Sequence, residues 1–294
     1  MIVAAAICPS PPLLAAELTG RADILPELRA ACAAAISRLL AAAPDVVAIV
    51  GPAETTGPRD PAGQLSLATF APALSPGRPL SDNSKRRAAG TAATAPPLPL
   101  ALGLGALLLD EAGYTGPRTL YGISEDASAA ACLALGRRLA VSASRVALLA
   151  MGDGSARRSA SAPGYLDERA APFDETVERA VRAGDLPAIA ALDPVLAADL
   201  LAVGRPAWQA LAGGLAAPVS AADPPTSRPA ADRPVVHLGA GDPVRADSLA
   251  AVRPQAEILY SNAPLGVAYL VATISPPAPA PSGKPGFLDA ALSA

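Results

Sequence analysis

Short apolar runs recur along the chain, and each one is followed by glycine, proline or polar residues. The clearest runs are residues 2–8, 45–50 (DVVAIV), 145–151 (RVALLAM) and 266–274 (GVAYLVATI). Runs of this length bounded by turn residues are typical of strands that are buried on both faces of a parallel sheet. Shorter strand-like segments are found at 64–70, 119–123, 235–238 and 257–260.

Helical periodicity occupies the intervals between these runs. Leu28, Cys32, Ile36 and Leu39 recur every three or four residues, which predicts a helix over 26–43. A strand, a helix and a second strand in this order form a right-handed crossover, and such a crossover joins parallel strands. Further helices are predicted at 98–112, 127–140, 167–183, 186–192, 194–203 and 207–215, and we expect those after residue 167 to cover one side of the sheet.

These patterns predict one α/β domain over residues 1–274. Two stretches rich in small residues and proline, 81–97 and 216–234, are expected to be mobile loops or insertions. The Pro- and Ala-rich residues 275–294 are expected to form a flexible tail.

Composition narrows the classes of partner and the compartment. The net charge is −3, and the only basic cluster is Lys85, Arg86 and Arg87, so nucleic acid is not expected as a partner. No apolar run reaches the roughly 20 residues of a membrane span. The three cysteines have no CxxC spacing and no secretory signal precedes them, which favours a cytoplasmic location.

Polar residues follow three of the clearest strands. Because ligands bind beyond the carboxyl ends of strands in open parallel sheets, the loops 8–12, 51–56 and 152–158 should line one cleft. The candidate ligand-binding residues in these loops are Ser10, Glu54, Thr55, Asp153, Ser155, Arg157 and Arg158.

Two of these residues raise the question of catalysis. Ser10, between prolines, either makes a turn hydrogen bond or acts as a nucleophile, and a nucleophile needs a nearby base. The only histidine is His237, distant in sequence, so a serine triad is not expected. Glu54 either has a functional role, as a general base or a ligand, or is a loop carboxylate without such a role.

The Gly-Asp-Gly-Ser loop at 152–155 offers different chemistry. It lacks the spacing and the Gly-Lys-Ser/Thr ending of a P-loop. Asp153 either caps a turn or binds a metal or a substrate group, which makes it a third catalytic candidate. Arg157 and Arg158 either clamp a carboxylate or phosphate or face solvent.

Four segments together resemble the class III extradiol ring-cleavage dioxygenase (LigB-like) superfamily, in an uncharacterised actinobacterial branch. They are VAAAICPSPPLL, DVVAIVGP, MGDGSARRSASAPGYLDERAAPFD and AEILYSNAPLGVAYLVAT. The resemblance covers residues 1–274 and is weakest over 216–250. It implies a three-layer fold, with a mostly parallel central sheet, helices on both faces and a site at the strand ends.

Catalytic members of this superfamily hold non-haem Fe(II) with two histidines and a glutamate. The resemblance places Ser10 at the first histidine, Ala53-Glu54 at the second, and Arg157 or Arg158 where a further histidine acts as acid or base. Glu257 aligns loosely with the carboxylate ligand. No metal and no cofactor are therefore expected, since the imidazoles are absent.

The sequence thus predicts a LigB-like protein that binds a small anionic or polar molecule, with aromatic and carboxylate-bearing molecules among the candidates. Two alternatives remain open. One is an enzyme, either a dioxygenase with an altered metal site or a hydrolase or transferase that uses Ser10 and Glu54. The other is a homo-oligomeric scaffold protein.

Overall fold

The computed structural model describes residues 1–20, 22, 24–67, 70, 96–216 and 253–276. Several predictions lie outside these residues: most of the two loops at 81–97 and 216–234, the strand at 235–238, His237 and nearly all of the tail.

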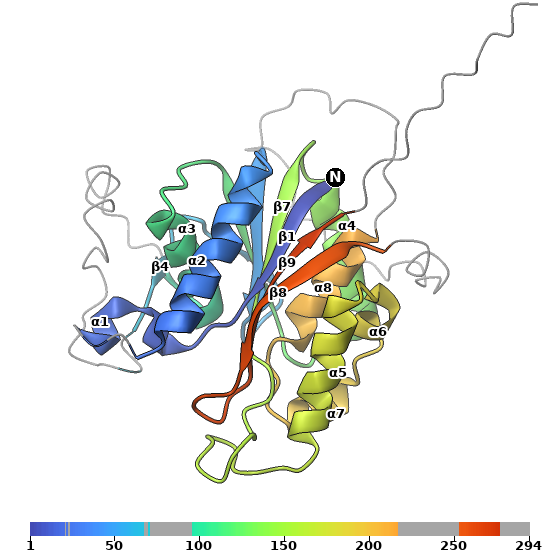
Figure 1. Cartoon of the computed structure of the whole chain (residues 1–294). Helices are drawn as coiled ribbons and strands as arrows, with labels where there is room; N and C mark the ends of the chain where they lie inside the picture. Colours follow the sequence, from blue (N-terminus) through green and yellow to red (C-terminus); the bar gives the residue numbers. More distant parts are fainter. Residues whose placement is uncertain (21, 23, 68–69, 71–95, 217–252, 277–294) are drawn as a thin grey trace, which may run out of the picture.

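A seven-stranded sheet forms the centre of the protein, in the order β3-β6-β2-β7-β1-β9-β8 (Figure 1). Its four middle strands are parallel, as predicted: β6 (Arg118–Ile123), β2 (Val46–Pro52), β7 (Val146–Met151) and β1 (Ile2–Cys8). The flanking strands are antiparallel to their neighbours: β3 (Gly57–Arg59), β9 (Tyr269–Ser275) and β8 (Gln255–Asn262). A small second sheet pairs β4 (Gln64–Leu65) with β5 (Pro97–Leu98).

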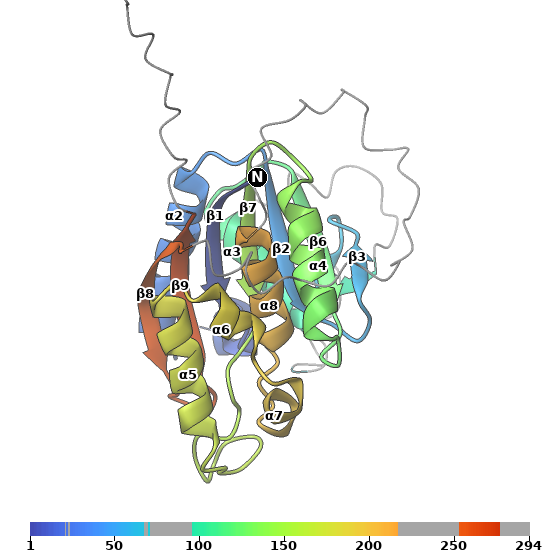
Figure 2. The same cartoon turned by 90° about the vertical axis from the view of Figure 1, so that its right-hand side faces the viewer.

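Helices pack against both faces of the large sheet (Figures 1 and 2). One face carries α2 (Pro26–Ala41) and α3 (Leu100–Glu111). The other carries α4 (Ala129–Ala140), α5 (Ala170–Arg182), α6 (Leu186–Ala190), α7 (Pro194–Asp199) and α8 (Arg205–Leu215). Two short elements follow β1, the 3-10 helix η1 (Pro12–Leu14) and α1 (Ala16–Thr19). Among the described residues, no helix is both long and apolar enough to cross a bilayer.

Alternation along β1 shows why its whole sequence is apolar. Ala4, Ala6 and Cys8 belong to the hydrophobic cluster beneath α2, whereas Ala5 and Ile7 belong to the cluster beneath α8. Successive side chains of a strand point to opposite faces, so a strand covered on both sides needs an apolar residue at every position.

Two predicted elements begin later than expected, for local reasons. The helix predicted from residue 167 begins at Ala170, because Asp167 accepts hydrogen bonds from the backbone and side chain of Arg169 and so forms a turn before the helix. The strand predicted from residue 266 begins at Tyr269, because Gly266 has a φ of 73° and ends a turn.

Strand direction decides which loops meet. β9 is antiparallel to β1, and β8 is antiparallel to β9, so β8 runs parallel to β1. The end of β8 at Asn262 and the start of β9 at Tyr269 therefore lie at the edge of the sheet where β1 and β7 also end.

Candidate functional site

The loops after β1 and β7 are joined at the carboxyl edge of the sheet. The backbone N–H of Ser10 donates to Asp153 Oδ1 at 2.6 Å. Ser10 is buried, and the backbone carbonyl of Asp153 accepts from the N–H of Gly204 at the start of α8. The structure thus brings these two candidates together, and Ser10 is paired with Asp153 instead of Glu54.

Asp153 lies in an environment that disfavours its charged form. Burial raises the pKa of Asp153 to about 6, although hydrogen bonds from Ser10 act in the opposite direction. Burial, together with the negative charge of Asp153, raises the pKa of the Tyr269 phenol. Asp153 in the loop after β7 and Tyr269 at the start of β9 are therefore two groups at this edge of the sheet whose deprotonation is disfavoured by burial.

A second cluster is centred on Asp174 of α5. The Oγ of the fully buried Ser155 donates to Asp174 Oδ2 at 2.5 Å, and the Ser155 N–H donates to Asp174 Oδ1 at 2.9 Å. Arg158 forms an ion pair with Asp174 Oδ2 at 3.1 Å. Burial raises the pKa of Asp174, while the bonds from Ser155 and Arg158 oppose the rise. Asp174 thus ties the loop after β7 to α5.

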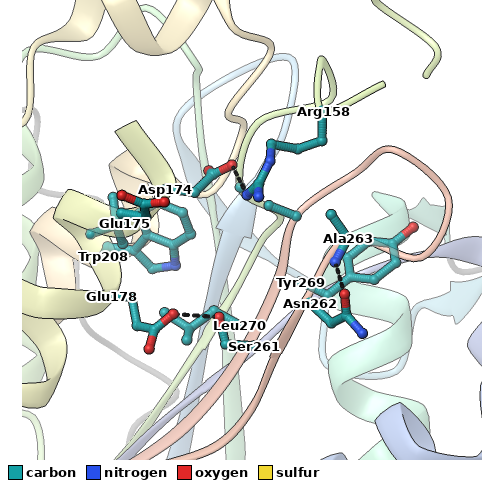
Figure 3. A pocket seen from close by; sticks show the side chains of 13 residues that line it. Arg158, Asp174, Glu175, Glu178, Trp208, Ser261, Asn262, Ala263, Tyr269 and Leu270 are labelled. Carbon is teal, nitrogen blue, oxygen red and sulfur yellow. Dashed lines mark hydrogen bonds and ion pairs between the residues drawn. The ribbon is translucent and has the colours of Figure 1, made fainter. Parts of the chain in front are cut away.

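A pocket of about 430 Å³ opens beside this cluster. It lies between α5, α8, the loop after β7 and the turn that connects β8 to β9 (Figure 3). Its volume falls within the roughly 300–1,000 Å³ that is usual for small-molecule sites. The lining residues are Gly154, Arg158, Asp174, Glu175, Val177, Glu178, Trp208, Ser261, Asn262, Ala263, Ala268, Tyr269 and Leu270.

Trp208 forms one wall of the pocket and has an unsatisfied donor. Its side chain is buried, and its indole Nε1 has no hydrogen-bond partner among the residues that the structure describes. In Figure 3 the nitrogen-bearing edge of the ring faces the space that the lining residues enclose. The ring fits because residue 204 is glycine: a Cβ at Gly204 would lie 2.4 Å from Trp208 Cζ2.

The three carboxyl groups of the pocket differ in their partners. Asp174 is held by Ser155 and Arg158. Glu178 accepts from Ser261 Oγ at 2.6 Å and pairs with Arg182 at 2.6 Å, and these contacts lower its pKa. Within the described part of the chain, no hydrogen bond or ion pair engages Glu175. Glu175 therefore contributes the uncompensated negative charge of the pocket.

Only part of the predicted cleft takes part in this arrangement. Arg158 lines the pocket, whereas Arg157 turns back on its own loop, where its Nη1 donates to the Gly164 carbonyl at 2.5 Å. Glu54 and Thr55 are exposed after β2, where Thr55 Oγ1 accepts from Arg59 at 2.9 Å.

Glu257 also lies apart from the pocket. Its carboxylate pairs at 2.6 Å with Arg38 of α2, on the opposite face of the sheet from α5 and α8. The structure therefore does not join Glu257, Glu54 or Thr55 to Ser10. Glu257 is held on the α2 face. Glu54 and Thr55 leave the same edge of the sheet as Ser10, but they follow β2, which β7 separates from β1, and they are exposed to solvent.

Sequence reasoning missed most of the pocket lining, although weak signals were present. Asp174 and Glu178 are four residues apart on a predicted helix, a spacing that places both on one face. Trp208 is the only tryptophan of the chain. Neither signal identifies a site until the positions of α5 and α8 are known.

The residues that the family resemblance would place at histidine positions are poor ligands for iron. Ala53 has no side-chain donor atom, and the guanidinium groups of Arg157 and Arg158 cannot coordinate a metal. Glu54 is a carboxylate, but it is exposed after β2, and Ser10 is buried with its backbone N–H donating to Asp153. Within the described ranges, no three His, Cys, Asp or Glu side chains are arranged to hold a metal ion.

Comparisons with known proteins identify no family for this chain. No protein-family model matches the chain, and no curated protein matches it. Among solved structures, the fold is similar to the crystal structure of uncharacterized protein JW3007 from Escherichia coli K12, with a TM-score of 0.43 and 14% identity. The match covers 93% of this chain and 100% of that chain.

Proposed function

We propose that the protein binds a small polar molecule in the pocket between α5, α8 and the β8–β9 turn. In this proposal it has a LigB-like fold but does not carry out iron-dependent ring cleavage. The observation that carries the proposal is the buried, unpaired indole N–H of Trp208 at the wall of a pocket of about 430 Å³.

An unpaired buried donor has a substantial energetic cost. Leaving such a group without an acceptor costs about 1–3 kcal/mol, which most native proteins avoid. A ligand that brings an acceptor to Trp208 Nε1 would recover this energy on binding. The polar groups around the pocket, held in place by Asp174 and its partners, would fix the ligand's orientation.

The proposal separates this chain from the iron enzymes by the chemistry of its side chains. Fe(II) in such enzymes is held by imidazole and carboxylate groups. The resemblance would place Ser10, Ala53-Glu54 and Arg157 or Arg158 where those enzymes have histidines. We therefore propose binding, and not iron-dependent ring cleavage, for the pocket. Asp153, whose pKa burial raises to about 6, precedes the pocket residue Gly154 in the chain.

Two measurements on the full-length protein test this proposal. Elemental analysis should find no stoichiometric iron after purification and after incubation with Fe(II), and oxygen uptake with catechol should stay at the level of the buffer. Tightly held iron together with catechol turnover would overturn the proposal. The full chain is required because His237 lies outside the described residues.

Binding itself is tested with the single tryptophan as the reporter. A library of small polar fragments should contain members that change Trp208 fluorescence in a saturable manner. The control is Glu54→Gln, which removes an exposed carboxylate outside the pocket and should give the same titration curves. If every fragment that binds leaves Trp208 fluorescence unchanged, the site is elsewhere and the proposal fails.

A further inference from the structure

The pocket also indicates the class of its ligand, provided that the proposed binding function holds. We infer that the ligand carries a protonated amine, held by Glu175, and a separate uncharged acceptor such as an amide or ketone oxygen, held by the indole N–H of Trp208.

The charges of the pocket favour a cation over an anion. Asp174 is balanced by Arg158 and Glu178 by Arg182, through ion pairs of 3.1 Å and 2.6 Å. Glu175 is an exposed carboxylate that no described residue balances, and it lines the same pocket as Trp208. An ammonium group in the pocket would be attracted by this carboxylate.

An anionic ligand would meet less favourable surroundings. Arg158 is the sole guanidinium that lines the pocket, and it already pairs with Asp174. A ligand carboxylate would have to displace Asp174 from Arg158 and would lie among three carboxyl groups. The expectation of a carboxylate clamped by Arg157 and Arg158 is also weakened, because Arg157 is bonded to Gly164.

The uncharged acceptor of the ligand is inferred from the indole N–H of Trp208. An indole N–H is a donor only, so its partner has to be an acceptor. Several other residues of the pocket lining, such as Gly154, Val177 and Leu270, have no side-chain acceptor. A carbonyl oxygen satisfies this donor without adding negative charge.

Three probes of similar size test the need for an amine and for an uncharged acceptor. 4-Aminobutanamide has a cation and an amide, pentanamide has the amide alone, and succinamate has an anion and an amide. Each is titrated into the uniformly ¹⁵N-labelled full chain while the single indole N–H resonance is followed. We expect 4-aminobutanamide to move the indole proton resonance downfield. It should bind about three- to fivefold more tightly than pentanamide, because a partly exposed ion pair contributes about that much to affinity. Succinamate should bind most weakly.

Variants then assign the preference to Glu175. In Glu175→Gln, 4-aminobutanamide should lose its advantage over pentanamide. In Glu168→Gln, which removes an exposed carboxylate that does not line the pocket, the advantage should persist. High salt should reduce the advantage in the unmodified protein because it screens the ion pair.

The outcomes distinguish the two levels of the proposal. If pentanamide or succinamate binds as tightly as 4-aminobutanamide and shifts the indole resonance, the pocket stands but the ligand class is wrong. If Glu175→Gln leaves the preference intact, the amine is held elsewhere and the inference is likewise overturned. If no probe and no library fragment moves the indole resonance, the binding function fails as well.

Discussion

Ser10 and Asp153 are 143 positions apart in the sequence, yet the backbone N–H of Ser10 donates to Asp153 Oδ1 at 2.6 Å. The contact exists because β1 and β7 are parallel neighbours, so that the loops after Cys8 and Met151 leave the sheet side by side. It places a carboxyl group whose pKa is raised to about 6 at the edge of the sheet that carries the pocket.

This raised pKa predicts the effect of pH on stability. In the unfolded chain Asp153 should titrate near pH 4, but in the folded protein it titrates near 6. The folded state therefore binds more protons than the unfolded state between these pH values. The contribution of Asp153 to the free energy of unfolding is fully present below about pH 4 and is lost as the pH rises through about 6. As the pH rises from 4 to 7, the free energy of unfolding of Asp153→Asn should increase by about 2 kcal/mol relative to that of the unmodified protein.

Urea unfolding at a series of pH values measures this difference. Asparagine keeps an oxygen that can accept from Ser10, so the comparison isolates the charge. Parallel pH profiles for the two proteins would show that Asp153 is not the group responsible.

The bond between Ser155 and Asp174 should contribute strongly to stability. Ser155→Ala removes the donor at 2.5 Å from a carboxyl group that is itself mostly buried. We expect a loss of about 1–3 kcal/mol in the free energy of unfolding. Ser144→Ala, at an exposed serine, should change it little. Equal effects of the two substitutions would contradict the role given to Ser155.

The close packing of α4 against α8 should tolerate no side chain at residue 136. A Cβ at Gly136 would lie 1.8 Å from the backbone carbonyl oxygen of Ala210, and backbone cannot move away cheaply. Gly136→Ala should therefore cost about 3 kcal/mol or more. Gly214→Ala is the matched control in α8, because its Cβ would lie 3.2 Å from the flexible end of Leu148 and 3.3 Å from the backbone oxygen of Gly136, which a small shift relieves. Thermal unfolding should rank the two variants in this order, and the reverse order would contradict the packing described.

Glu257 should have no part in ligand binding. Its side chain is 62% exposed and pairs with Arg38 on the α2 face of the sheet. Glu257→Gln should leave the affinity for 4-aminobutanamide unchanged and should alter the melting temperature only slightly, because exposed ion pairs contribute little. A marked loss of affinity would restore Glu257 to the site that the family resemblance implied.

The strands and the larger helices could be predicted because their signals are local. The apolar run at 2–8 and the helical spacing over 26–43 each indicate which residues of the element are buried in the core. Both elements form close to the predicted bounds. The antiparallel direction of β9 and β8 was not predictable in the same way, since an apolar run does not encode strand direction.

The candidate site was predictable only where it depends on strand ends. Asp153 and Ser10 meet because both follow parallel neighbours. Glu175 belongs to α5 and Trp208 to α8, and their contribution depends on how these two helices pack against the sheet. Periodicity identifies the buried face of such a helix but not the cavity that its remaining residues line.

The most direct test of the binding pocket is the position of the single indole N–H resonance, because Trp208 is the only tryptophan of the chain. A ¹H–¹⁵N spectrum of the full-length protein is recorded before and after addition of 4-aminobutanamide at saturating concentration. A saturable downfield shift of the indole proton is the predicted result, because an acceptor then pairs with Nε1. An indole resonance that stays in place while backbone resonances elsewhere respond would show that the ligand binds outside this pocket.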